Sequence, residues 1–173
     1  MAGDRGCLVP PFSLCDSLSA VDIMTRQDYI EFILDHYNNP HHKGKIEDPD
    51  LLVNGGNPGC GDIVTIFVRL DDNDRIVDAT FDGQGCTISM AASSLVMDMI
   101  IGKTIAEVDA MDYTGLLDEL GREVVQSRIR CATLAIDTIK AGAREYPSHK
   151  ATGKKLVSPI ILSETFRGDG LEG

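Results

Sequence analysis

A pair of neighbouring strands constrains the fold more than any other feature of this sequence. Hydrophobic side chains recur at alternate positions over residues 63–70 and again over residues 76–82, which is typical of half-buried strands. The polar residues 71–74 between them favour a turn, so the two segments predict an antiparallel hairpin. Cys60 precedes the first strand and Cys86 follows the second. The hairpin therefore predicts that these two cysteines lie at the same edge of a sheet.

Both cysteines lie in glycine-rich turns rather than on hydrophobic stripes. Glycines flank Cys60 on both sides, and Asp62 follows it two residues later. Glycine lets a backbone turn sharply and approach a bound group closely, and we expect free backbone N–H groups around Cys60 that can hydrogen-bond a sulfur. Cys86 begins a predicted helix, where the helix dipole stabilises the thiolate that attacks sulfur or binds a metal.

The rest of the pattern is mainly helical and follows the strands, an order that predicts an α+β domain. A short strand is also expected at Leu51–Val53. Apolar side chains at helical spacing predict that the first helix buries Tyr29, Ile30, Ile33, Leu34 and Tyr37. The helices expected are a first from Thr25 to Asn38, a second from Cys86 to Gly102, two short ones capped by Thr104 and Asp112, and a last from about Ser127 to Arg144, before Pro147.

Composition bounds the domain and its partners. With 173 residues, 43% of them hydrophobic, the chain can form one core, which we place at residues 25–147. A flexible N-terminal extension (1–24) and a flexible C-terminal tail (148–173) are expected around it, with a strand or partner-binding segment at 156–162 as the alternative. The formal charge of −11 argues against nucleic acid and anionic membranes as partners, and no apolar run is long enough to span a membrane.

The five cysteines indicate where the protein acts and which thiols matter. Cysteines in a chain without an export signal indicate a reducing compartment, so we expect a cytoplasmic protein with metal-binding or reactive thiols. Cys7 and Cys15 lie outside any turn-plus-helix context and are expected to be incidental. Cys131 lies near the start of the last helix, where the neighbouring charges of Arg128 and Arg130 favour its thiolate.

Three thiolates and a carboxylate can form a four-coordinate site. Cys60, Cys86, Cys131 and Asp62 would suit Zn²⁺. They would also suit an iron–sulfur cluster, although clusters usually take four cysteines. A hard carboxylate oxygen is a poorer partner for a soft cluster than a thiolate. A cluster held this way is expected to be labile, which suits a protein that gives its cluster away.

Other readings of these residues stay open at this point. Free cysteines are often buried as small hydrophobic residues, and the spacing of these three matches no common zinc ribbon. The adjacent His41 and His42 are further candidate ligands. Because they lie in a polar linker, we expect them to be solvated rather than metal-bound.

Several long motifs in a fixed order give the chain a resemblance to a known family. Over about residues 26–146 it resembles the iron–sulfur cluster assembly scaffold proteins of the IscU/NifU N-terminal type. The motifs are His36-Tyr37-Asn38-Asn39-Pro40, Gly56-Asn57-Pro58-Gly59-Cys60-Gly61-Asp62, Gly83-Gln84-Gly85-Cys86-Thr87-Ile88-Ser89 and Arg130-Cys131-Ala132-Thr133-Leu134-Ala135.

The resemblance implies a SufE/NifU-like fold, a small antiparallel sheet of about three strands packed on one side by several helices. It implies a scaffold or carrier rather than an enzyme: a cysteine desulfurase delivers sulfur as persulfide, iron is added, and a [2Fe–2S] cluster passes to apo-proteins. Cys60, Cys86 and Cys131 match the family's cluster cysteines. Asp62 matches the aspartate associated with cluster release, and Cys131 matches the persulfide acceptor.

The chain departs from the family pattern at two places. Arg130 replaces a histidine found in many relatives, and arginine is not a metal ligand. The segment 125–129 lacks the Leu-Pro-Pro-Val-Lys sequence that serves a dedicated Hsp70 chaperone, which argues against that partner. The interval between Cys86 and Cys131 is too short for the insertion of the zinc-binding SufU branch. The alternatives are a zinc-bound sulfurtransferase, in which Cys131 relays sulfur, and a zinc-stabilised binding module; a homo-oligomer is left open.

Overall fold

The computed structural model describes residues 24–153 and 156–159. The predicted hairpin is present: β2 (Asp62–Leu70) pairs with β3 (Ile76–Gln84), and β1 (Leu51–Asn57) pairs with the other edge of β2, all antiparallel. Strand β4 (Leu156–Pro159) adds to β1 in parallel, so the strand order is β3-β2-β1-β4. The predicted α+β fold with a three-stranded antiparallel sheet is therefore confirmed, and β4 extends it.

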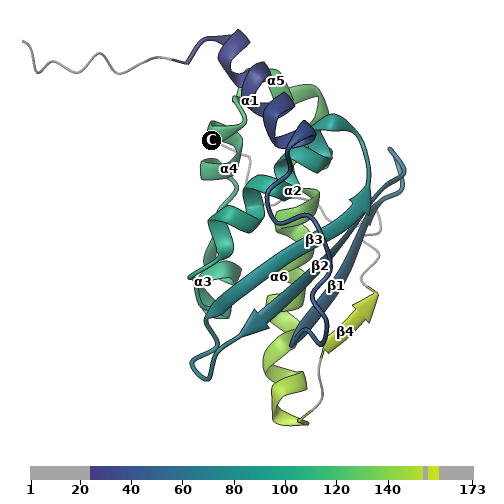
Figure 1. Ribbon diagram of the computed structural model, residues 1–173, viewed down its shortest axis with the longest axis vertical. Coiled ribbons are helices and arrows are strands. Elements are labelled where there is room, and N and C mark those ends of the chain that lie inside the picture. Colours follow the sequence, from purple (N-terminus) through teal and green to yellow (C-terminus); the bar gives the residue numbers. More distant parts are fainter. Residues whose placement is uncertain (1–23, 154–155, 160–173) are drawn as a thin grey trace, which may run out of the picture.

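Helices cover one face of this sheet, as expected (Figure 1). Helix α6 contacts β1 and β2, helix α2 contacts β3, and α1 packs on α2. The helices are α1 (Arg26–Asn38), α2 (Thr87–Ile100), α3 (Ile105–Ala110), α4 (Thr114–Glu119), α5 (Arg122–Val125), the 3-10 turn η1 (Gln126–Arg128) and α6 (Ile129–Ala151). Neither α5 nor η1 was expected from the hydrophobic pattern.

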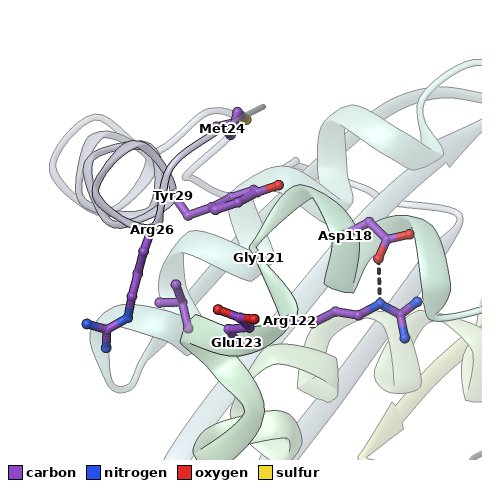
Figure 2. A pocket seen from close by; sticks show the side chains of 8 residues that line it. Met24, Arg26, Tyr29, Asp118, Gly121, Arg122 and Glu123 are labelled. Carbon is purple, nitrogen blue, oxygen red and sulfur yellow. Dashed lines mark hydrogen bonds and ion pairs between the residues drawn. The ribbon is translucent and has the colours of Figure 1, made fainter. Parts of the chain in front are cut away.

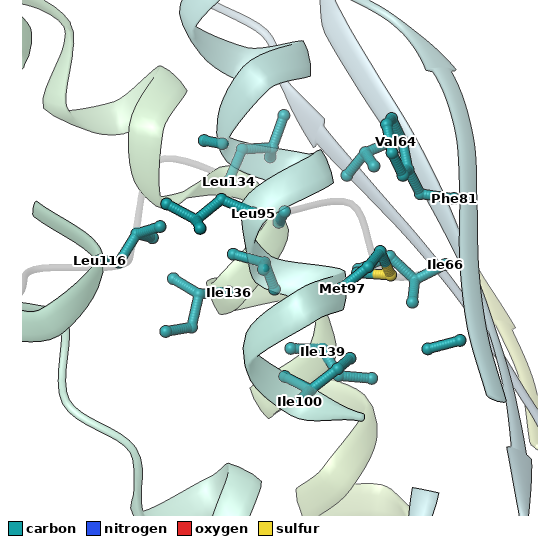
Figure 3. Close-up of a cluster of buried hydrophobic side chains, with 14 of the residues drawn as sticks. Val64, Ile66, Phe81, Leu95, Met97, Ile100, Leu116, Leu134, Ile136 and Ile139 are labelled. Atoms are coloured by element: carbon teal, nitrogen blue, oxygen red, sulfur yellow. The ribbon is translucent and has the colours of Figure 1, made fainter. Parts of the chain in front are cut away.

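The core lies between the sheet and the two long helices (Figure 3). Side chains from the inner face of β2 and β3 meet those of α2 and α6, and the buried residues include Val64, Ile66, Phe81, Leu95, Met97, Ile100, Ile136 and Ile139. Burying one large apolar side chain contributes about 1.5–3 kcal/mol. This layer fixes how the two helices lie against the strands.

Two glycines allow α6 to approach β1 closely. A Cβ atom added at Gly55 would lie 1.8 Å from Oγ1 of Thr138, and one added at Gly142 would lie 2.4 Å from Cγ2 of Val53. Both distances are far below van der Waals contact, so only glycine fits. This close packing fixes α6 against β1, and the start of the helix then lies near the turn between β1 and β2.

Two expectations about the helices are wrong. Of the predicted α1 stripe, Leu34 and Tyr37 are each 43% exposed, while Ile33 and His36 are buried. Burial lowers the pKa of His36, so the ring lies in the interior as a neutral imidazole. The last helix was expected to end before Pro147, but α6 continues through it to Ala151.

The predicted flanking segments fall at the limits of the description. Residues 1–23, which include Cys7 and Cys15, and residues 160–173 lie outside the described residues. The end of α6 and strand β4 take in residues that had been assigned to the C-terminal tail. In the described part of the chain, none of the helices has both the length and the apolar character needed to cross a membrane.

Candidate metal centre

Three of the four predicted ligands meet where β1, β2 and α6 come together. Sγ of Cys60 and Sγ of Cys131 are 3.5 Å apart, and the ligand atoms of Cys60, Asp62 and Cys131 all lie within 4.8 Å of one another. Cys60 is exposed, whereas Asp62 and Cys131 are buried. A cation placed among these atoms would be reached from the Cys60 side.

The turn that carries Cys60 is held by the side chain and carbonyl of Asn57. The backbone N–H groups of Cys60 and Gly61 donate to the Asn57 carbonyl at 3.1 and 2.8 Å. The N–H of Gly59 donates to Asn57 Oδ1 at 3.2 Å. The expectation of free N–H groups beside Cys60 is therefore wrong for these three residues, because the turn itself uses them. Because these hydrogen bonds fix the turn, the Cys60 thiol is held at a defined position.

Asp62 joins the two cysteine turns across the end of the hairpin. Its Oδ1 accepts a hydrogen bond from the Cys86 backbone N–H at 3.0 Å, and its Oδ2 lies 3.7 Å from Cys86 Sγ. A Cβ at Gly85 would lie only 3.0 Å from Asp62 Oδ1, so a side chain there would crowd this carboxylate. The prediction that the two turns share one edge of the sheet is confirmed.

Cys86 is the N-cap of α2. Its sulfur accepts a hydrogen bond from the Ser89 N–H at 3.4 Å, so a side chain that usually caps through oxygen is here a thiol. The sulfur thus lies at the positive end of the α2 dipole, as the sequence predicted. The Cys86 sulfur contacts the other candidate ligands through Asp62 Oδ2.

Cys131 occupies the first turn of α6, as predicted, but its thiol is not activated as expected. Burial, then hydrogen bonding to Cys60 and Asp62 and the charge of Cys86, raise the pKa of Cys131. Arg128 and Arg130 are exposed, where water screens their charges. The expected lowering of the Cys131 pKa is therefore wrong for this structure, in which burial favours the neutral thiol.

Two further side chains border the site and were not predicted. Asn57 Nδ2 approaches Cys131 Sγ at 3.9 Å, besides holding the Cys60 turn. The Ser89 hydroxyl is buried without a hydrogen-bond partner among the described residues, and it borders the same space above Gly85 as Asp62. An unpaired buried hydroxyl beside the Asp62 carboxylate, on the residue whose N–H contacts the Cys86 sulfur, fits a site that holds a further group. Both residues belong to the glycine-rich motifs, which was the only signal for them.

The cavity between α1 and α5 is a different feature (Figure 2). It has a volume of about 400 Å³, and none of the predicted ligands lines it. Tyr29 lies on Gly121, where a Cβ would approach the ring to 2.6 Å. Arg122 is engaged with Asp118 at 2.5 Å. These contacts show that the cavity is a gap in the packing between α1 and α5.

Comparison with known proteins assigns the chain to a family. The family model for the NifU-like N-terminal domain matches residues 28–153. The iron-sulfur cluster assembly scaffold protein IscU of Buchnera aphidicola is 37% identical over 125 residues, which cover 70% of this chain and 96% of that protein. IscU of Escherichia coli K12 is 36% identical over 125 residues, with the same coverage. The mitochondrial iron sulfur cluster assembly protein 1 of Yarrowia lipolytica is 36% identical over 132 residues, 75% of this chain and 72% of that protein.

Solved structures agree with this placement. A candidate scaffold of the SUF system from Fervidobacterium islandicum is 30% identical, with a TM-score of 0.56 over 65% of this chain and 94% of that one. A NifU-like N-terminal protein from Brucella abortus, at 20% identity, shares the fold with a TM-score of 0.57 over 72% of this chain and 99% of that one. The chain belongs to the family of NifU-like N-terminal domains and is related to the IscU scaffold proteins.

Proposed function

We propose that this protein is a scaffold that assembles a labile [2Fe–2S] cluster as its cargo and passes it to apo-proteins. Its ligands would be Cys60, Cys86, Cys131 and Asp62. The observation that carries the proposal is the convergence of two thiols 3.5 Å apart with a buried carboxylate that also contacts the third cysteine. The names of the IscU relatives, all described as scaffold proteins, support the same role.

Exposure divides the roles of the cysteines. Cys60 lies on the surface turn, and Cys131 lies 99% buried beneath it. We assign the persulfide to Cys131, as the family resemblance implies: its thiolate attacks the outer sulfur of the desulfurase persulfide, and the desulfurase cysteine leaves as a thiolate. Since Cys131 is covered and protonated in the free protein, docking of the desulfurase has to displace the Cys60 turn and remove the proton first.

Asp62 supplies the reason for release. Its Oδ1 is engaged by the Cys86 N–H, which leaves Oδ2 as the oxygen for iron. Carboxylate oxygen is a hard ligand and binds a soft cluster less firmly than thiolate does. A scaffold with three thiolates and this carboxylate would hold a cluster and still yield it to a recipient with four cysteines.

Anaerobic reconstitution with Fe²⁺ and sulfide tests the proposal. We expect visible absorption and circular dichroism of a [2Fe–2S] cluster, lost when Cys60, Cys86 or Cys131 is changed to serine. The matched control is Cys15→Ser, at a cysteine expected to be incidental, which should load normally. Failure of the unmodified protein to load would overturn the proposal.

The zinc-bound sulfurtransferase uses the same four residues, and no contact in the site favours it over the scaffold. Tightly bound Zn²⁺ that survives reconstitution, together with persulfide transfer to Cys131, would be its signature. Zinc without persulfide uptake would indicate a zinc-stabilised binding module. We place the reaction in the cytoplasm, with a cysteine desulfurase and apo iron–sulfur proteins as partners.

A further inference from the structure

Three of the chain's four histidines gather away from the cysteines, beside α2. His36 is on α1, His41 and His42 are in the loop that follows, and Asp98 is in the last turn of α2. The ligand atoms of His36, His41 and Asp98 lie within 4.8 Å of one another. His41 and His42 are exposed, as expected, and each also contacts Asp98.

Two imidazole rings hold the two oxygens of one carboxylate. His41 Nδ1 lies 2.7 Å from Asp98 Oδ2, and His42 Nε2 lies 3.1 Å from Asp98 Oδ1. The side chains of His42 and Asp98 are 35% and 36% exposed, and that of His41 is 50% exposed. An ion from solvent can therefore reach His41 and Asp98 directly, whereas His36 is buried.

The backbone around these histidines is strained and firmly fixed. His42 has φ +56°, in the left-handed region that costs a residue with a side chain about 1–3 kcal/mol. The loop is tied to β3, because the Phe81 N–H donates to the His42 carbonyl at 3.0 Å. It is tied to α2 by the His41 N–H, which donates to Ser94 Oγ at 2.8 Å. These two hydrogen bonds hold His41 and His42 beside Asp98 in this conformation.

His36 is oriented from the interior. One ring nitrogen, Nδ1, lies 2.9 Å from Ser94 Oγ. The ring centroids of Phe32 and His41 each lie 4.6 Å from that of His36. The hydrogen bond and the packing on both sides fix the orientation of the His36 ring, as second contacts do for histidines that bind metals.

We propose that His36, His41 and Asp98 form a second, independent site for a borderline divalent cation of the Zn²⁺ class, with His42 holding the other oxygen of Asp98. Imidazole and carboxylate are ligands that Zn²⁺ accepts, and a formal charge of −11 attracts cations. Asp98 lies at the opposite end of α2 from Cys86, about 18 Å along the helix axis. The two sites share no ligand.

Calorimetric titration with Zn²⁺ tests this site after the cysteine site has been removed by Cys60→Ser, Cys86→Ser and Cys131→Ser together. We expect this triple variant to bind one Zn²⁺ per chain. Adding His41→Ala or Asp98→Asn should weaken binding more than 100-fold, and adding His42→Ala should weaken it about 10–100-fold, as expected for an orienting residue. The matched control is His149→Ala, the one histidine outside the cluster, which should bind as before.

Substitution of Co²⁺ for Zn²⁺ gives a second readout. In the triple variant we expect the visible bands of a nitrogen- and oxygen-bound Co²⁺ without sulfur charge-transfer absorption. Circular dichroism checks that each variant is folded, and His41 and Asp98 are partly exposed, so their substitution leaves the core intact. Absence of Zn²⁺ binding in the triple variant, or equal losses in the His41 and His149 variants, would overturn the proposal. Neither result bears on cluster assembly, which needs the cysteines.

Discussion

Substitution of Gly55 by alanine tests how the fold brings Cys131 to Cys60. The added Cβ would lie 1.8 Å from Oγ1, 2.9 Å from Cβ and 3.0 Å from Cγ2 of Thr138. Rotating the Thr138 side chain gives no relief, because both of its branches are too close, and Oγ1 is bonded to the Leu134 carbonyl at 2.6 Å. Helix α6 must therefore move away from β1.

The magnitude follows from these contacts. Overpacking in a core costs about 1–3 kcal/mol, and a clash with a helix that cannot yield locally belongs at the upper end, about 2–3 kcal/mol. Thr138→Ala alone loses a buried hydroxyl and a methyl group, about 1–2 kcal/mol. In the double variant the contacts with Oγ1 and Cγ2 are removed, and only the 2.9 Å contact with the Cβ at position 138 remains. We expect this double variant to be about 1–2 kcal/mol more stable than the sum of the single changes predicts.

Urea unfolding of the four proteins, followed by far-UV circular dichroism, measures this coupling. Gly56→Ala is the matched control on the same strand, since its Cβ would lie 3.7 Å from the nearest non-neighbouring atom, at ordinary contact distance. Cluster loading should fall in Gly55→Ala, because α6 carries Cys131, and recover in part in the double variant, where only the contact with the Cβ at position 138 remains. Additive effects within about 0.5 kcal/mol would refute the close seat of α6 on β1.

Three further outcomes are expected. Asp62→Ala should slow cluster loss about 5–30-fold, a rise of about 1–2 kcal/mol in the activation free energy of release, because it removes the carboxylate through which the cluster is released. Cluster loss is followed by visible absorption, and faster loss in the variant would contradict this role. Cys60 should react with iodoacetamide well before Cys131, because burial raises the pKa of Cys131 and covers it, and peptide mass spectrometry shows the order. Burial and the charge of Asp74 raise the pKa of Tyr146 to about 12, so the free energy of unfolding that the neutral phenol contributes below pH 10 should be lost between pH 10 and 12. Tyr146→Phe should therefore reduce the fall of the urea midpoint over this range. An unchanged fall in the variant would count against this role of Tyr146.

The parts of the site set by local pairing were predictable from sequence. Alternating side chains and a polar turn define the β2–β3 hairpin, and a hairpin brings its two outer ends together whatever packs on it. The contact of Asp62 with the Cys86 N–H at 3.0 Å is the direct result. Capping was equally local: Thr104 forms the capping box that its sequence indicates, and Thr25, a residue that can cap a helix, is the N-cap of α1.

The position of Cys131 over Cys60 was not predictable from the residues themselves. It depends on α6 lying almost in contact with β1, which Gly55 and Gly142 allow by having no side chain. Hydrophobic periodicity carries no signal for an absent side chain. The same long-range packing buries the Cys131 thiol, so burial outweighs the helix dipole and the exposed arginines that the sequence made prominent.

The prediction of the end of α6 was wrong because contacts with distant residues compensate for the hydrogen bond that a proline removes from a helix. Pro147 removes one helical hydrogen bond, yet α6 continues because residues on either side of the proline reach the β2–β3 turn. Tyr146 donates to Asp74 Oδ1 at 3.2 Å, and Lys150 contacts the same oxygen at 2.5 Å. His36 is buried in place of Leu34 for a similar reason, since Ser94 supplies a hydrogen-bond partner in the interior.

The raised pKa of Cys131 has a consequence for how the proposed scaffold would take up and release iron. In the free protein a protonated Cys131 thiol beside Cys60 and Asp62 avoids crowding several negative charges in a buried space. A bound cation reverses this preference, because it stabilises the thiolate and the carboxylate together. Loading therefore exchanges protons for iron, and release takes them back. Under the proposed function, the same four residues would therefore serve the empty and the loaded protein by changing their protonation.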